Sequence, residues 1–362
     1  MIKIDSLSFY SETPVKFVEK VNRLHPFVSW GLNNMAPEEL YDAIDYSPIH
    51  ASAIRTKVDN AVGMGFKKDY KINSRETLND VAKQLFFEYI VTGNLFLETV
   101  WRNDRKLGLS AFHVIPSKFW RAKSPENNQL YSDKWLFCHD WVNWRKSGVV
   151  EFNEFDPINF TDKQVLHIRN YTPGLLYYGA PSYLASFPDI RLSRAISEYN
   201  LNSILNGAQP SLWINFPQEP DSQNEMEDVL RRLEDRYTGP RNSGKIIVSY
   251  GSEGVKPDIT TINPTLSQGM FSEIFALVRE NILSGHQIPD PSICGLPSPS
   301  GFASQADALR TAHELFMKTT IKPLREFMIR ELEPVVQLMY PDEVVKLEIQ
   351  DNEFLSAPTP NV

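Results

Sequence analysis

Two long segments with the residue pattern of helices, 181–206 and 267–284, enclose a short block in which that pattern changes. The first of these helices is either interrupted or initiated around Pro188. In the second segment, apolar residues recur at three- and four-residue steps, as they do on one face of a helix. The enclosed block, residues 211–262, predicts a strand, a charged helix and two further strands in turn. A chain of 362 residues has room for two or three ordinary domains, or for one elongated series of modules.

A loop rich in proline, glycine and serine follows the second helix, over residues 285–302. A loop of this length without secondary structure inside a compact chain usually has a function. After it, residues 304–340 predict the longest helix, which would reach on the order of 50 Å if continuous. We expect Pro323 to kink this helix.

The first half of the chain predicts an α+β module over residues 61–170. A helix opens at Ser47, which is a suitable N-cap residue, and a second helix over residues 76–92 ends at Gly93. Short strands rich in aromatic residues follow up to residue 170. Residues 1–46 have no clear pattern.

The charge of the chain limits how it can contact DNA. Its net charge is −8 and its pI is near 5.5. Proteins that grip DNA do so by neutralising phosphates with Lys and Arg, so we expect any DNA contact here to be local and weakly adhesive. The chain has only two cysteines, which predicts a protein of a reducing cytoplasm. It has no apolar run of about 20 residues and no leading hydrophobic segment, so we predict no membrane span and no signal peptide.

Residues 239–245 match the GxxxxGK pattern of a phosphate loop, with Gly239, Gly244 and Lys245 in place. Such a loop needs a Ser or Thr next, to hold Mg²⁺, and a helix after it. Here Ile246 follows, and the predicted order is helix, then strand. We favour a simple turn and keep a nucleotide-dependent DNA-processing enzyme as the alternative.

No other catalytic or metal-binding pattern is present. GxSxG, HExxH and Cys–His nucleophile motifs are missing, and Cys138 and His139 lack the spacing of a zinc site. We therefore predict no enzyme activity, no cofactor and no metal. The aromatic cluster around Trp135 and Trp144 could stack single-stranded nucleic acid, but a sheet core or subunit interface is the more common role. His286 could titrate near neutral pH, although we favour a hydrogen bond at a helix terminus.

Several short motifs, in this order and spacing, resemble the compact portal proteins of long-tailed bacteriophages and prophages. The resemblance extends over roughly residues 47–340. The motifs are Gly93-Asn94, Val165-Leu166-His167-Ile168, Tyr178-Gly179-Ala180-Pro181, Asn206-Gly207-Ala208-Gln209-Pro210, the segment 239–245 before a strand, Ile288-Pro289 and Thr320-Ile321-Lys322-Pro323.

The resemblance implies an α+β portal fold with a division into named parts. These are an N-terminal segment (1–60), an α/β wing (61–180), a stem helix (181–210), a small α/β clip (211–262), a second stem helix (263–285), a tunnel loop (286–302), a long kinked wing helix (303–340) and a C-terminal tail (341–362) with a reduced or absent crown.

The resemblance also implies a structural role. The chain would be one subunit of a ring, usually of about twelve copies, that forms a channel at one capsid vertex. Double-stranded DNA would pass through it during genome packaging, retention and ejection. Its partners would be the terminase motor, the head–tail adaptor and the major capsid protein. It would act in the virion after assembly in the host cytoplasm.

The tunnel loop has a charge pattern that suits this role, because no Lys or Arg occurs between Arg279 and Arg310. A ring repeats every side chain, so one inward cation per subunit would surround the duplex with cations and hold it. An ordinary surface linker is the alternative. The residues expected to face the DNA are Gln287, Ile288, Pro289, Asp290, Ile293, Leu296, Pro297, Ser298 and Ser300.

The predicted clip helix over residues 225–237 carries charges of both signs. It is either a solvated face with pairs four residues apart or a surface on which partners dock. The residues we expect to contact partners are Glu225, Asp228, Arg231, Arg232, Asp235 and Arg236.

Overall fold

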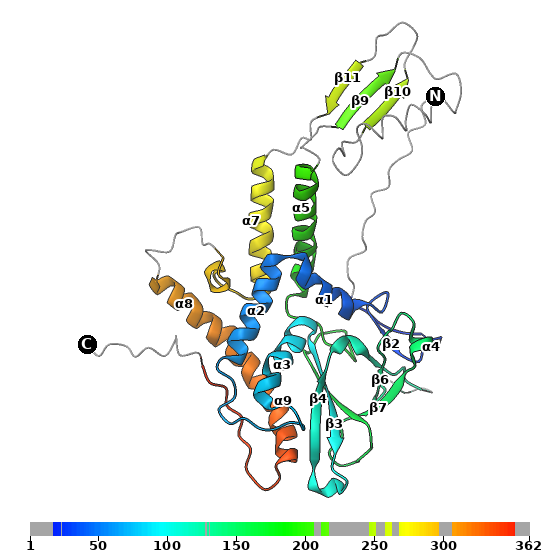
Figure 1. The fold of residues 1–362 in the computed structure, drawn as a ribbon, viewed down its shortest axis with the longest axis vertical. Helices are drawn as coiled ribbons and strands as arrows, with labels where there is room; N and C mark the ends of the chain where they lie inside the picture. Colours follow the sequence, from blue (N-terminus) through cyan, green and yellow to red (C-terminus); the bar gives the residue numbers. More distant parts are fainter. Residues whose placement is uncertain are drawn as a thin grey trace, which may run out of the picture. The chain divides into compact units, whose positions relative to one another are not determined.

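A computed structural model describes residues 17–22, 24–126, 129, 131–205, 211–216, 246–250, 258–262, 268–296 and 306–351. The chain divides into two compact units (Figure 1). One combines residues 1–188 with 281–362, and the other comprises residues 189–280.

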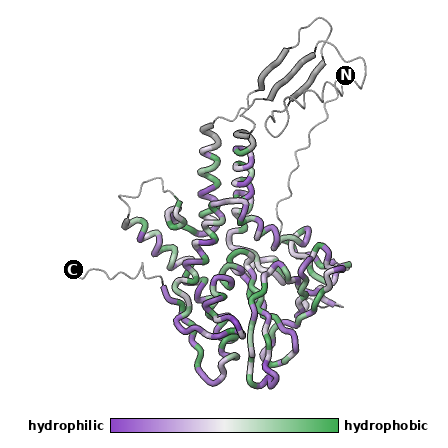
Figure 2. The backbone as a smooth tube through the Cα atoms, in the orientation of Figure 1, coloured by the Kyte–Doolittle hydropathy of each residue, from purple (hydrophilic) through white to green (hydrophobic). Residues whose placement is uncertain are grey.

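The larger unit is built on a six-stranded sheet in the order β4-β3-β8-β7-β6-β5. All neighbours are antiparallel except β7 and β8, which are parallel. Hydrophobic stretches run along β3 and β4 in Figure 2, and the first four residues of β3 are buried. The strands are β3 (Asn94–Trp101), β4 (Leu109–Ile115), β5 (Trp120–Ala122), β6 (Lys134–Phe137), β7 (Val150–Glu154) and β8 (Gln164–Arg169).

Three helices precede this sheet: α1 (Ala36–Tyr46), α2 (Pro48–Val62) and α3 (Leu78–Thr92). Ser47 caps α2 as expected, since its Oγ accepts a hydrogen bond from the His50 backbone N–H. The third helix begins two residues later than predicted, because Thr77 and Asp80 form a capping box.

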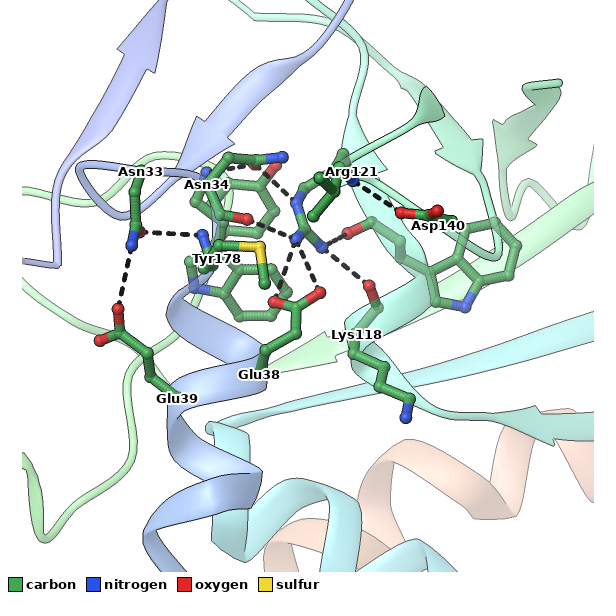
Figure 3. A network of polar contacts seen from close by, with 12 residues as sticks. Asn33, Asn34, Glu38, Glu39, Lys118, Arg121, Asp140 and Tyr178 are labelled. Atoms are coloured by element: carbon green, nitrogen blue, oxygen red, sulfur yellow. Dashed lines mark hydrogen bonds and ion pairs between the residues drawn. The ribbon is translucent and has the colours of Figure 1, made fainter. Parts of the chain in front are cut away.

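The N-terminal segment, which has no readable sequence pattern, contains a hairpin as well as α1. Strands β1 (Glu19–Val21) and β2 (Val28–Trp30) pair antiparallel. Arg121 of β5 fixes this segment to the sheet (Figure 3). Its guanidinium donates to the Asn34 side chain and carbonyl, both at 2.7 Å, and lies 3.4 Å from a Glu38 oxygen.

The long C-terminal helix is interrupted, as expected near Pro323. Helix α8 (Ala306–Phe316) passes through a π-helical turn (Met317–Ile321) into α9 (Lys322–Met339). Pro323 lies in the first turn of α9, where a missing N–H costs little. The side chain of Arg325 donates to the carbonyls of Asn60 and Ala61, so α9 caps the carboxyl end of α2. The strand that residues 344–349 could form is only an isolated bridge between Ile349 and Phe66.

The smaller unit contains most of α5 (Phe187–Leu205) and α7 (Gln268–Gly285). Along the chain, the strands of a three-stranded sheet lie between these two helices, as the sequence predicts. Strand β9 (Ser211–Phe216) lies between β10 (Ile246–Tyr250), which is parallel to it, and β11 (Asp258–Ile262), which is antiparallel. The predicted start around Pro188 is confirmed, and the start at residue 181 is not. Residues 184–186 form a 3₁₀ turn, and α5 begins at Phe187 with Pro188 in its first turn.

Candidate functional site

Three of the sequence motifs meet at one buried junction, formed by Gly93, Asn94, Asn170, Gly179 and Ala180. The Asn94 side chain accepts from the Gly179 N–H at 2.7 Å and donates to the Gly179 carbonyl at 2.9 Å. Asn170 donates its backbone N–H to Gly93 and its side-chain amide to Ala180, both at 2.8 Å. We call this set the asparagine junction. It determines how the chain leaves the sheet toward α5.

Both glycines of the junction are required by close backbone approach. Gly93 ends α3 in the left-handed conformation (φ 72°), and a Cβ there would lie 2.4 Å from the Ala180 carbonyl carbon. A Cβ on Gly179 would lie 2.3 Å from the Gly93 oxygen. Neither distance is possible for a real side chain, so only glycine allows the two segments to touch.

His167 completes the junction from β8. Its Nε2 lies 2.9 Å from the Asn94 Oδ1, and its ring stacks on Phe96 with centroids 4.4 Å apart. Burial, with the charge of Arg169, lowers its pKa well below the usual value, so the neutral ring donates to Asn94. Within the described ranges, no three His, Cys, Asp or Glu residues gather as a metal site would require.

A buried histidine pair lies where α7 passes into the tunnel loop. The His50 Nδ1 is 2.8 Å from the His286 Nε2, and neither side chain is exposed. Tyr183 stacks on His286 with centroids 4.7 Å apart. Burial lowers the pKa of His50 to about 4 and that of His286 well below its usual value. His286 is therefore neutral at pH 7, and its ring makes a hydrogen bond directly after α7, which agrees with the role that we favoured over titration.

The described part of the loop after α7, up to residue 296, contacts α2. Asp290 caps a short 3₁₀ helix, Pro291–Cys294, by accepting from the Ser292 N–H at 2.8 Å. The carbonyl of Cys294 accepts from the Ser52 hydroxyl of α2 at 2.9 Å. Gln287 adopts φ 58°, and its carbonyl accepts from Thr320 in the π-helical turn at 3.3 Å.

The loop residues expected to face DNA differ in exposure. The exposed side chains are those of Gln287 and Pro289, whereas Asp290, Ile293 and Leu296 are half-buried. Ile288 is only 5% exposed, which corrects its assignment to the DNA-facing set: its side chain packs in the core. Pro297, Ser298 and Ser300 lie outside the described residues.

Other candidate residues fall into two groups. Trp135 and Trp141 are buried, so the aromatic cluster forms core, as we favoured over nucleic-acid stacking. The clip helix over residues 225–237 and the loop over residues 239–245 lie outside the described residues. These include Glu225, Asp228, Arg231, Arg232, Asp235 and Arg236.

Sequence reasoning missed His50 and Lys57, both of which are buried in α2. A signal was available, because the two residues stand seven apart, on the same helix face as Ala53 and Ala61. Their partners could not be read from the sequence, since His286 is 236 residues from His50.

Across the described part of the chain, no helix combines the length and the hydropathy needed to cross a bilayer.

Comparison with known proteins gives consistent results. A family model described as phage portal protein matches residues 69–353. A probable portal protein of Haemophilus phage HP1 is 22% identical over 195 residues, which cover 53% of this chain and 54% of that relative. The chain thus matches only about half the length of this curated relative.

Solved structures with a similar fold include two from portal or neck assemblies. A chain from the neck of a native gene transfer agent particle, computed with C12 symmetry, is 16% identical with a TM-score of 0.56, over 84% of this chain and 81% of that one. An HK97-family phage portal protein from Corynebacterium diphtheriae is 11% identical with a TM-score of 0.52, over 88% and 97% of the two chains. The predicted α+β portal fold is confirmed, and the chain belongs to the phage portal protein family.

Proposed function

We propose that this chain is a structural portal subunit, which closes with copies of itself into a ring at one vertex of a phage capsid. Double-stranded DNA passes through the ring during packaging, is retained behind it and leaves through it on ejection. The observation that carries this proposal is the family match over residues 69–353. The small α/β insert between α5 and α7 agrees with it.

The proposed ring has twelve subunits. Support comes from the gene transfer agent neck chain, whose assembly was computed with C12 symmetry. Cyclic closure repeats one interface around an axis, so it needs no second kind of subunit. The proposed location is the portal vertex of the virion, after assembly in the cytoplasm of a bacterial host.

We assign the parts of the chain by the same reasoning. The six-stranded sheet and its helices are the wing, beside the major capsid protein, and α5 and α7 are the stem. The β9–β11 sheet belongs to the clip, where the terminase motor and the head–tail adaptor dock.

The role assigned to the tunnel loop is to touch the passing DNA without binding it tightly. Over residues 280–309 the chain has no Lys or Arg, and Gln287, Pro289, Ile293 and Leu296 remain as surface candidates on the described part of the loop. Since a ring multiplies each contact, the lack of cations keeps the summed attraction to phosphates low.

A structural role is favoured over a nucleotide-dependent enzyme at residues 239–245. Strand β10 begins at Ile246, directly after Lys245. A phosphate loop needs a helix N-terminus at that point, whose amides would face the phosphates.

Imaging of the purified protein tests the ring. We expect closed rings in negative-stain micrographs, and a native mass that is an integral multiple of the 41.5 kDa chain. A protein that stays monomeric at high concentration, even with its scaffold and capsid partners, would contradict the proposal.

A charge placed in the loop tests the passage of DNA. Leu296→Lys adds one cation per subunit at a half-buried position, and we expect packaging to slow or stall. Leu296→Gln is the matched control, which is polar and similar in length but uncharged. Equal packaging rates for the two variants and the wild type would show that charge on this loop does not matter.

A further inference from the structure

A cavity of about 140 Å³ lies within the larger unit, at the base of the tunnel loop. Its lining includes Lys57, Asn170, Ser182, Gln287 and Thr320, which come from five separate segments of the chain. One water molecule occupies about 30 Å³ in the liquid, so the space suits several waters or one small oxyanion.

Lys57 is the cationic residue of this cavity. It is 4% exposed, and its ammonium donates one hydrogen bond, 3.4 Å long, to the Ser182 hydroxyl. An ammonium group has three donors, and no carboxylate of the described residues lies within ion-pair distance of it. Burial lowers the pKa of Lys57 to about 8, so the group is still mostly protonated at neutral pH.

The groups around Lys57 do not neutralise it. His50 and His286 are uncharged, and the charge of Lys57 itself helps to keep the pKa of His286 low. Glu331 influences the lining residue Tyr89, but it is ion-paired with Arg330 at 3.1 Å. A buried charge without a counter-charge is strongly unfavourable, because burial removes its hydration without replacement.

We propose that this cavity binds a small oxyanion, with Lys57 as its cationic ligand. Ser182 accepts its hydrogen bond from Lys57, so its own hydroxyl proton is available to the anion. The Asn170 amide uses one proton on the Ala180 carbonyl and has a second to donate. The site lies in a single chain, so it goes beyond the ring and does not depend on it.

A bound anion would join the tunnel loop to the elements behind it. Gln287 opens the loop, Thr320 belongs to the π-helical turn, and Ser182 lies just before α5. An anion held among these residues would stabilise their relative positions. Because it would bind only the folded state, it would also stabilise the protein against unfolding.

Thermal unfolding with sodium phosphate as the probe tests the site, at an ionic strength held constant with sodium chloride. For the wild type, we expect the midpoint to rise by about 2–4 °C at ten times the dissociation constant. Lys57→Met, which keeps the hydrocarbon length without the charge, should remove this rise. Lys83→Met is the matched control, because Lys83 is exposed, and it should respond like the wild type. Sodium acetate in a parallel series shows whether a planar carboxylate also binds.

Two results would overturn the proposal: no rise with either anion in the wild type, or an equal rise in Lys57→Met. If Lys57→Met fails to fold, titration calorimetry of phosphate into the wild type and into Ser182→Ala tests the site instead. One phosphate per chain, bound several-fold more weakly without the hydroxyl, supports the site. No binding, or binding unchanged by Ser182→Ala, rejects it.

Discussion

Arg121 keeps a full positive charge inside the larger unit, where its side chain has no exposed surface. The guanidinium lies over Trp30 and Trp141, with its carbon 5.7 and 5.1 Å from the ring centroids. Asn34, Glu38 and two backbone carbonyls nearby accept its protons (Figure 3). One side chain thus joins the hairpin, α1 and the sheet.

We expect Arg121→Met to destabilise the protein by about 3–5 kcal/mol, because it leaves Glu38 and the carbonyls buried without their donor. Arg145→Met is the control, since Arg145 is exposed, and its effect should stay within about 0.5 kcal/mol. Urea unfolding of both variants measures the difference. Similar midpoints would show that the buried network contributes little.

The histidine pair makes stability depend on pH. In the unfolded chain each histidine binds a proton near pH 6.5, whereas burial holds the folded pKa of His50 at about 4. The unfolded state therefore binds more protons in this window, and stability falls as the pH drops from about 6.5 toward 4.

We expect the unfolding temperature of the wild type to fall more steeply over this window than that of a His50→Gln/His286→Gln double variant. His113→Gln, which removes an exposed histidine, should behave like the wild type. Parallel pH curves for wild type and double variant would contradict this expectation.

Single residues could be predicted from the sequence where their partners are local. Ser47 was identified as a helix cap because its partner is three residues away. The contacts of Lys57 and His50 depend on segments more than 100 residues distant, and no local pattern contains that information.

At the scale of secondary-structure elements, the asparagine junction requires glycine at positions 93 and 179, because the chain can take its path toward α5 only if these two segments touch. Gly93 and Gly295 share the left-handed conformation (φ 72° and ψ 13° against φ 72° and ψ 15°) but have different surroundings. A Cβ on Gly93 would clash with Ala180, whereas a Cβ on Gly295 would meet nothing within 4 Å.

This pair separates backbone strain from steric contact. Gly295→Ala should cost only the strain of a left-handed alanine, about 1–2 kcal/mol. Gly93→Ala adds the clash and should cost clearly more, with a change in the circular dichroism of the folded protein. Denaturant midpoints measure both, and equal losses would mean that the two segments can separate freely.

Helices and their caps were predicted well, because their hydrophobic periodicity and end signals are local. The start of α5 stayed open between Pro181 and Pro188, because either proline suits a first helical turn, and the helix begins at Phe187. The hairpin β1–β2 was missed because its strands have only three residues each. The strand order of the six-stranded sheet, with parallel β7 and β8, depends on tertiary packing.

On the scale of the whole molecule, the larger unit joins two separate stretches of sequence. Helix α9 packs on α2 and β4, and its side chains Met328, Leu332 and Val335 are buried. The chain leaves and re-enters this unit at nearly the same point, since a Cβ on Gly285 would lie 2.2 Å from the Ser186 Oγ.

We therefore expect a variant with a short Gly/Ser linker in place of residues 189–280 to keep the larger unit folded, with a cooperative thermal transition. Truncation after residue 188 should not fold, because it lacks α9. Circular dichroism of the two proteins tests this, and a cooperative transition in the truncated chain would contradict the assignment of α9 to the core of the larger unit.

The two-part origin of the larger unit also has a consequence during translation. Ribosomes add about 5–20 residues per second, so residues 189–280 take on the order of 5–20 s to synthesise. Throughout this interval, the nascent chain presents the apolar surface of α2 and β4 that α9 will cover. The core of the larger unit can therefore close only after α9 has left the ribosome.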